Sequence, residues 1–212
     1  MIVGDIASWR DHFRSLEEQM AEAIEVAWPI GIAPLRSRKG EMTHEDHITN
    51  HLVAALIRTK KVPGRIVPQY CLLMDSPGKG VTLPSRIDFV LTIGDDENAY
   101  LAFECKRLNV PCKAGTRSLV GEYVNDGLMR FVTGQYSNGL PLAMMLGYVM
   151  DARLERARDA LGRAMTVRSK VIHLKSTTDG PVLSGRPLRF KTMHVCPSGH
   201  DIAVAHTLLG WS

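Results

Sequence analysis

The chain of 212 residues has only four cysteines and 6% aromatic residues, within the normal range of a soluble globular protein, and it has no long apolar run. Its cysteines form no C-x-x-C pair, the spacing typical of zinc and redox sites. They are Cys71, Cys105, Cys112 and Cys196. The longest apolar run, at 140–150, is interrupted by Pro141 and Gly147 and falls short of the roughly 20 residues that span a bilayer. The first residues also lack a charged and then apolar leader. We therefore expect a protein of a reducing, cytoplasmic setting with no membrane segment.

Excess charge is small as well. The sequence has 26 basic and 22 acidic side chains, and a net charge of +4 does not by itself indicate a nucleic-acid binder. Basic residues do gather at 36–39 and at 58–61, and such runs are most often solvated faces, although they can also bind phosphate. The cluster residues are Arg36, Arg38, Lys39, Arg58, Lys60 and Lys61. Because repeats and linker-like stretches are absent, we expect one domain over 1–212.

Apolar periodicity and turn residues predict the order of helices and strands. Helices are expected at 8–27, 44–60, 119–136 and 151–165. The first should end before Pro29, and the second should have Thr43 as its N-cap and Asp46 as the capping-box acid. Strands are expected at 67–74, 86–93, 99–107, 142–150, 170–175, 188–195 and 202–208. We expect the first three strands to form a meander, the fourth to be buried and parallel, and the last three to be edge strands. The predicted fold is α/β, with a central mixed β-sheet flanked by helices.

Three ionisable residues interrupt the apolar pattern of two predicted strands. Side chains alternate between the faces of a strand, so Asp88 projects from the face opposite to Ile87 and Phe89. By the same rule Glu104 and Lys106 share one face of their strand. If the two strands are hairpin neighbours, Asp88 and Glu104 lie close together and repel each other unless a cation neutralises them. A divalent ion such as Mg²⁺ would do so, with the backbone carbonyl of Cys105 as a further ligand.

A fourth acid, Glu45, lies at the start of the helix predicted at 44–60. It precedes Ile48 and Leu52 by three and seven residues, so it is on the apolar face and points toward the sheet. The alternative is that Glu45 caps the positive end of its own helix. Likewise Asp88 could be a structural hydrogen-bond acceptor, and Glu104 with Lys106 a structural ion pair. The convergence of all four residues on one place favours a metal site that activates water for attack on a phosphodiester. Lys106 would orient or deprotonate that water, or stabilise negative charge on the phosphate.

These residues resemble the PD-(D/E)xK nuclease superfamily. Its core consists of a helix carrying a glutamate, a strand meander carrying an aspartate and then an acid-x-lysine, a second helix and a further strand. Glu45 in THEDHITNHL, Asp88 in SRIDFVL and Glu104-Cys105-Lys106 in AFECKRL match this pattern in order and element type. Ile87 stands where the family name has a proline, a position that varies in the family. The resemblance covers residues 43–150.

The resemblance implies a restriction-endonuclease-like core at 43–150, preceded by an N-terminal helix and connection at 1–42 and followed by a C-terminal helix and edge strands at 151–212. It implies Mg²⁺-dependent hydrolysis of phosphodiesters, with Mn²⁺ as a substitute. Asp88 and Glu104 would be metal ligands, Lys106 the catalytic lysine and Glu45 a supporting acid. Gln135, at the end of the predicted helix, would reach a phosphate or the metal-bound water, or would simply contact solvent.

Other constellations have weaker support. His194, Cys196, His200 and His206 could form a zinc site, but their spacing fits no familiar finger. The stretch 75–80 contains a Gly-Lys pair but lacks the first glycine of a phosphate-binding loop, so we interpret it as a hairpin in which Lys79 could touch phosphate. No serine or cysteine lies in a nucleophile-elbow motif.

The expected activity is that of a metal-dependent endonuclease, most readily on DNA, with RNA as an alternative substrate. Its specificity would come from loops, from a homodimer or from a partner subunit, and a role in restriction or anti-phage defence would fit the resemblance. The competing hypothesis is a catalytically silent nuclease-like fold that binds nucleic acid or assembles with other proteins.

Overall fold

The computed structural model describes residues 6–36, 44–76, 80–94, 99–136, 139–181 and 185–211. Its elements run α1 (Ile6–Arg36), α2 (Glu45–Thr59), β1 (Arg65–Ser76), β2 (Gly80–Thr92), β3 (Tyr100–Leu108), β4 (Val110–Cys112), β5 (Gly115–Arg117), α3 (Val120–Glu122), η1 (Tyr123–Leu128), α4 (Met129–Val132), β6 (Leu142–Val149), α5 (Leu154–Val167), β7 (Leu174–Asp179), β8 (Leu188–Val195) and β9 (Asp201–Gly210). Among the described residues, no helix combines the length and apolar character needed to cross a membrane.

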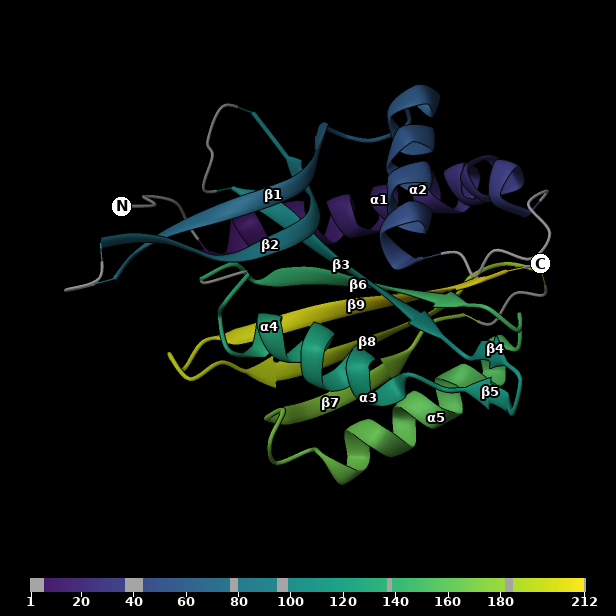
Figure 1. Ribbon diagram of the computed structural model, residues 1–212. Helices are drawn as coiled ribbons and strands as arrows, with labels where there is room; N and C mark the ends of the chain where they lie inside the picture. The colour runs from purple at the N-terminus through teal and green to yellow at the C-terminus, as the bar shows by residue number, and fades with distance from the viewer. Residues whose placement is uncertain are drawn as a thin grey trace.

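Seven strands form one mixed sheet in the order β1-β2-β3-β6-β9-β8-β7. The pairs at both ends are antiparallel, whereas β6 is parallel to both β3 and β9. Helices α1 and α2 cover one face, and the helical segment from α3 to α4 covers the other together with α5 (Figure 1). The predicted central mixed sheet with flanking helices is therefore confirmed. The β1–β2–β3 meander and the fully buried, parallel β6 are confirmed as well.

Helix α1 is longer than predicted, because it continues through Pro29 and Pro34 to Arg36. A proline inside a helix removes one hydrogen bond and normally ends or kinks the helix. Here the apolar stripe does not stop at the proline, since Trp28, Ile32 and Leu35 are all buried. Trp28 also donates a hydrogen bond from Nε1 to the carbonyl of Gly210 in β9, at 2.9 Å. Packing against the sheet thus compensates for the missing backbone bond.

The N-terminus of α2 also differs in detail. The N-cap is His44, which makes no side-chain cap hydrogen bond, while the predicted cap Thr43 lies outside the described residues. The side chain of Asp46 does not complete a capping box and instead forms a 3.7 Å ion pair with Arg86.

Two boundaries and the position of two strands were predicted wrongly in the last third of the chain. Helix α5 begins at Leu154 rather than at 151, because Ala152 has a φ of 57°, which no right-handed helix accommodates. Turns occupy 168–173, so β7 begins at Leu174 and not at 170. Strands β8 and β9 are not edge strands: β9 lies between β6 and β8, which suits its buried run 204–209, and only β7 is at that edge.

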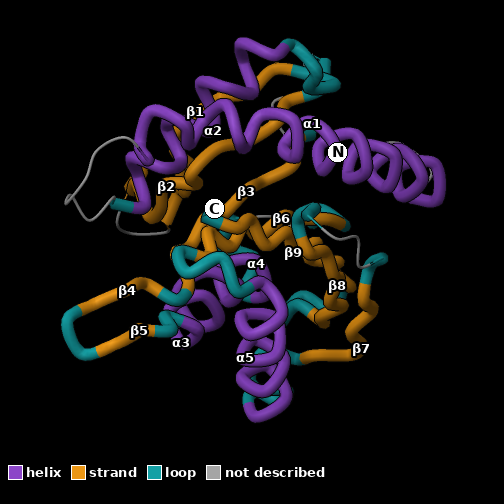
Figure 2. Tube along the Cα trace, turned by 90° about the vertical axis from the view of Figure 1, so that its right-hand side faces the viewer, coloured by secondary structure: helices purple, strands orange, loops and turns teal. Residues whose placement is uncertain are grey.

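The predicted helix 119–136 ends at Val132 and contains a π-helical segment, η1. The buried residues come as neighbouring pairs four positions apart, at 123 and 124, 127 and 128, and 131 and 132. This spacing is wider than the 3.6-residue period, as expected where a π turn is inserted. Gln135 consequently lies in the turn after α4 rather than on the helix. The short hairpin of β4 and β5 was not predicted, and it projects from the body of the molecule (Figure 2).

Close packing of α1 on α2 at Gly31 leads to a stability prediction. A Cβ atom at residue 31 would lie 3.0 Å from the carbonyl oxygen of His51 and 3.1 Å from the Cα of Leu52, so the two helices would have to separate. We expect Gly31→Ala to lower the free energy of unfolding by about 1–2 kcal/mol in spite of the better helix propensity of alanine. Gly121→Ala is the matched control, because nothing lies within 4 Å of its Cβ position, and it should stabilise by about 0.5–1 kcal/mol. Urea denaturation of both variants measures this; equal effects would contradict the tight helix contact.

Candidate active site at the fork between two strands

The candidate site lies where β2 and β3 part. Their pairing ends at Phe89 and Phe103, but β3 continues beside β6 as far as Leu108. The freed edge of β3 has backbone N–H groups that no neighbouring strand accepts, and two carboxylates take them instead. Asp88 Oδ2 accepts the N–H of Cys105 at 2.7 Å, and Glu45 Oε2 accepts the N–H of Arg107 at 2.8 Å. Both acids are thereby fixed against β3 from different elements.

Lys106 lies at the centre of this group. Its ammonium nitrogen is 2.7 Å from Glu104 Oε1, 3.0 Å from Glu45 Oε1 and 3.0 Å from the carbonyl oxygen of Cys105. A lysine ammonium has three N–H donors, so these three oxygens use all of them. Four residues predicted from the sequence, Glu45, Asp88, Glu104 and Lys106, are therefore brought together, and Glu45 points toward the sheet as expected. The Cys105 carbonyl predicted as a metal ligand faces the same group.

Arg130 and Tyr136 complete the site, and neither was selected from the sequence. Arg130 Nη1 lies 3.3 Å from Glu104 Oε1 and also donates to the hydroxyl of Tyr136. That hydroxyl in turn donates to the carbonyl of Arg86, two residues before Asp88. The π turn of η1 places Arg130 against Glu104, and ordinary helical periodicity could not have predicted this position. No hydrogen bond or ion pair within the described chain joins Gln135 to the acids, so its role stays a prediction.

Burial dominates the electrostatics of the site. The side chain of Glu104 is 1% exposed, and its Oε2 has no hydrogen-bond partner among the described residues. Burial and the nearby Asp88 raise the pKa of Glu104 from 4.5 to about 7, against the opposing effects of Lys106 and Arg130. Burial also raises the pKa of Asp88. Burial alone would lower the pKa of Lys106, but Glu104 and Glu45 together raise it, so this lysine stays protonated.

The donor set suits a hard divalent cation. Asp88, Glu104 and the Cys105 carbonyl offer only oxygen atoms, which are the ligands that Mg²⁺ prefers, and the unpartnered Oε2 of Glu104 is a buried acceptor without a donor. No group of three or more acidic, histidine or cysteine side chains in the described ranges is arranged to hold a metal. An ion held here would therefore use the carbonyl and water to complete its coordination, as Mg²⁺ commonly does.

The alternative zinc set is engaged in hydrogen bonds elsewhere. Both ring nitrogens of His194 and of His206 are bonded, in a buried series that joins Tyr123 to His206, then Thr192, then His194 and then the carbonyl of Ile172, at 2.7–2.9 Å. Because the carbonyl can only accept, His194 donates to it from Nδ1. With both imidazoles neutral, Thr192 then donates to His194, His206 donates to Thr192, and Tyr123 donates to His206. His200 is bonded to Ser198. The structure gives the zinc hypothesis no support.

Comparisons with known proteins add no relative. No protein-family model matches the sequence, and no curated protein and no solved structure matches the chain. The likeness to PD-(D/E)xK nucleases therefore rests on Glu45, Asp88, Glu104 and Lys106 and on the order of the elements that carry them.

The two carboxylates in the first turn of α2 provide a matched pair for testing the fork. Glu45→Ala removes an acceptor from the Arg107 N–H and from Lys106, and we expect it to lower the free energy of unfolding by about 1–3 kcal/mol. Asp46→Ala removes only an exposed 3.7 Å ion pair with Arg86 and should cost under about 0.5 kcal/mol. Chemical denaturation compares them, and equal losses would show that Glu45 contributes no more than a surface charge.

The buried histidines predict a loss of stability in acid. Burial lowers the pKa of both His194 and His206, so below about pH 6.5 the unfolded chain takes up protons that the folded chain does not. The free energy of unfolding should then fall by up to about 1.4 kcal/mol per pH unit for each histidine. Glu104 acts in the opposite sense, because its raised pKa gives stability that is lost as the pH rises from 4.5 to about 7.

Glu104→Gln separates the two effects. In this variant the loss of stability between about pH 6.5 and about pH 5.5 should be steeper than in the wild type, because Glu104 no longer titrates against the histidines. Urea titrations of both proteins at each pH measure the difference. A Glu104→Gln protein whose stability does not change over this range would contradict the neutral, buried state of the histidines.

Proposed function

We propose that this protein is a metal-dependent nuclease of the PD-(D/E)xK type that hydrolyses phosphodiester bonds, with DNA as the expected substrate. The observation that carries the proposal is the convergence of Glu45, Asp88, Glu104 and Lys106 at the fork between β2 and β3. They come from three separate elements, and a buried oxygen of Glu104 is left without a donor. Replacing buried charges by apolar residues is often neutral or stabilising, so stability alone does not account for these residues.

The order of the elements supports a restriction-endonuclease-like core. Helix α2 carries Glu45, the β1–β2–β3 meander carries Asp88 and then Glu104 with Lys106, and a helical segment leads to the parallel strand β6. This is the order that the resemblance implies. RNA is the alternative substrate, because the same chemistry would hydrolyse its phosphodiester bonds.

In the proposed mechanism Asp88, Glu104 and the Cys105 carbonyl would hold Mg²⁺ or Mn²⁺. When bound, such an ion polarises the phosphodiester and lowers the pKa of an attacking water. Lys106 is protonated, which favours a role in stabilising negative charge on the phosphate over a role as a base. Glu45 positions the ammonium of Lys106, and Arg130 places a second positive charge beside Glu104. Sequence specificity would come from loops, a second copy or a partner subunit. The proposed role in restriction or anti-phage defence rests on the resemblance.

A second candidate function has one observation in its favour. All three donors of Lys106 are satisfied within the protein, as they would be in a purely structural ion cluster. A catalytically silent, nucleic-acid-binding or assembly subunit would have the same contacts. Activity measurements on site variants distinguish the two functions.

The test is cleavage of plasmid, single-stranded DNA and RNA substrates by the pure protein, with Mg²⁺ or Mn²⁺ and with EDTA. Metal-dependent cleavage is expected, and Asp88→Ala and Lys106→Met should each lower the rate by on the order of 100-fold or more. Asp88 would hold the ion, and Lys106 would place a positive charge at the reacting phosphate.

Asp201→Asn and Lys175→Met are the matched controls. These residues form an exposed 2.8 Å ion pair away from the fork, and their variants should cleave at the wild-type rate. No metal-dependent cleavage of any substrate, or cleavage unaffected at Asp88 and Lys106, would reject the nuclease and favour the silent subunit.

A further inference from the structure

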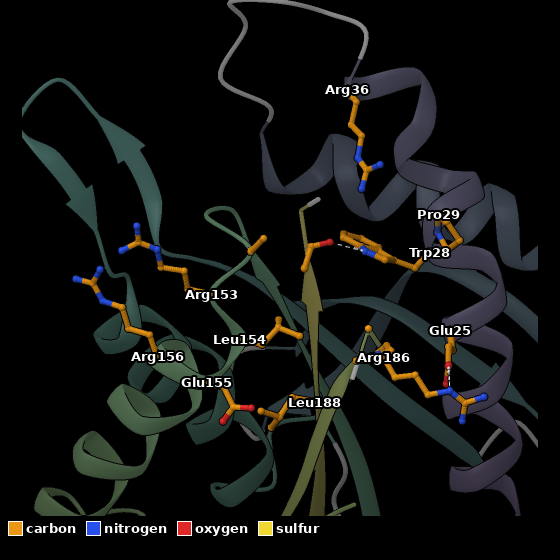
Figure 3. A pocket seen from close by; sticks show the side chains of 14 residues that line it. Glu25, Trp28, Pro29, Arg36, Arg153, Leu154, Glu155, Arg156, Arg186 and Leu188 are labelled. Atoms are coloured by element: carbon orange, nitrogen blue, oxygen red, sulfur yellow. Dashed lines mark hydrogen bonds and ion pairs between the residues drawn. The ribbon is translucent and has the colours of Figure 1, made fainter. Parts of the chain in front are cut away.

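A second candidate site lies on the surface, apart from the acids. A cleft of about 890 Å³ separates the C-terminal half of α1 from the start of α5 and is closed at its base by the end of β9. Its size is within the range of ligand-binding clefts. Trp28, Pro29, Leu154 and Leu188 give it apolar walls, and four arginines line it, Arg36, Arg153, Arg156 and Arg186 (Figure 3).

The arginines of this cleft outnumber its acidic residues. Arg36, Arg153 and Arg156 are exposed and form no ion pair within the described chain. Arg186 and the neighbouring Arg189 share a single carboxylate, that of Glu25, each at 2.9 Å. Among the described residues that line the cleft, Glu155 is the only other acid. Arginine is the side chain best suited to bind phosphate, because its planar guanidinium donates two parallel hydrogen bonds.

The arginines lie around the rim rather than converging on one point. Arg153 and Arg156 extend from the start of α5 on one side, whereas Arg36 points toward Trp28 from the end of α1 and Arg186 lies beside Glu25 (Figure 3). Trp28 in the wall of the cleft is only 6% exposed, so it offers no free ring for a base to stack on. This arrangement suits an extended polyanion whose successive phosphates contact different arginines, more than a single compact phosphate.

The cleft is also near the acidic site. Strand registers align Lys106 with Gly147 and Leu208, and align Leu108 with Val149 and Gly210. Gly210, at the base of the cleft, is thus two residues along and two strands across from Lys106. At the usual spacings of a sheet, their Cα atoms are about 12 Å apart. Buried side chains pack between the two sites: Trp28 stacks on Tyr148 with ring centroids 5.3 Å apart, and Tyr148 bonds to Thr49, one turn after Glu45.

We propose that this cleft binds the phosphodiester backbone of a nucleic-acid strand and holds it beside the acidic site. The choice of nucleic acid as ligand rests on the function proposed above. The contacts are to phosphates and not to bases, so binding is independent of sequence. The arginines at the start of α5 and at the end of α1 are positioning residues for substrate and take no part in the chemistry.

The test measures binding separately from cleavage. Fluorescence anisotropy with labelled single-stranded DNA, duplex DNA and RNA, all in EDTA, reports affinity without metal. Arg153→Gln combined with Arg156→Gln should weaken binding about 10-fold or more for every sequence and should lower the slope of log affinity against log salt by about 1.4–1.8. In cleavage assays the same double variant should raise KM and leave kcat unchanged.

Two controls keep the outcomes distinct. Arg163→Gln changes an exposed arginine of α5 that does not line the cleft, and it should bind as the wild type does. Asp88→Ala should also bind nucleic acid as the wild type does. Loss of cleavage with normal binding in this variant would show that the cleft binds independently of the proposed catalysis. The proposal is overturned if the wild type binds no nucleic acid, if the arginine double variant binds as tightly as the wild type, if Arg163→Gln weakens binding equally, or if ATP but no oligonucleotide binds in the cleft.

Discussion

The separation of β2 from β3 after Phe103 is the constraint on which the rest of the site depends. A strand edge without a neighbour has donors that must be satisfied, and here the carboxylates of Asp88 and Glu45 satisfy them instead of another strand. Each acid is consequently held by the backbone of β3, the strand that itself carries Glu104 and Lys106. Small movements of α2 would disturb Glu45, its bond to Arg107 and the ammonium of Lys106 together.

The site is electrostatically costly for the folded chain. Glu104 is almost completely buried, one of its oxygens has no partner, and its pKa is raised to about 7 although two cations lie beside it. Burying charge in this way rarely adds net stability, and replacement of such clusters by apolar residues is often neutral or favourable. The stability of the sheet therefore does not account for this cluster of charges, which agrees with the cation site proposed above. The sheet is already held by a continuous apolar core on both of its faces.

Sequence patterns identify the acidic residues because each depends on a local rule. Alternation along β2 and β3 separates Asp88, Glu104 and Lys106 from their apolar neighbours, and helical spacing puts Glu45 on the inner face of α2. Arg130 and Tyr136 escape the same reasoning, because a π-helical segment precedes Arg130 and Tyr136 lies in the turn after α4, where no helical stripe applies. Helix α1 extends past two prolines because Trp28 and Ile32 pack against distant elements, and no local propensity contains that information. The position of β9 at the centre of the sheet is likewise decided by partners far away in the sequence.

That central position of β9 has a consequence for how the chain is made. Until residues 201–210 have been synthesised, β6 has an open edge, and the β7–β8 pair has no sheet to join. The first helix cannot complete its packing either, because Trp28 bonds to Gly210, 182 residues further along the chain. A nascent chain lacking β9 thus exposes an apolar parallel strand, which is the kind of edge that invites pairing with other chains. The exposure ends only when β9 is inserted and closes the sheet.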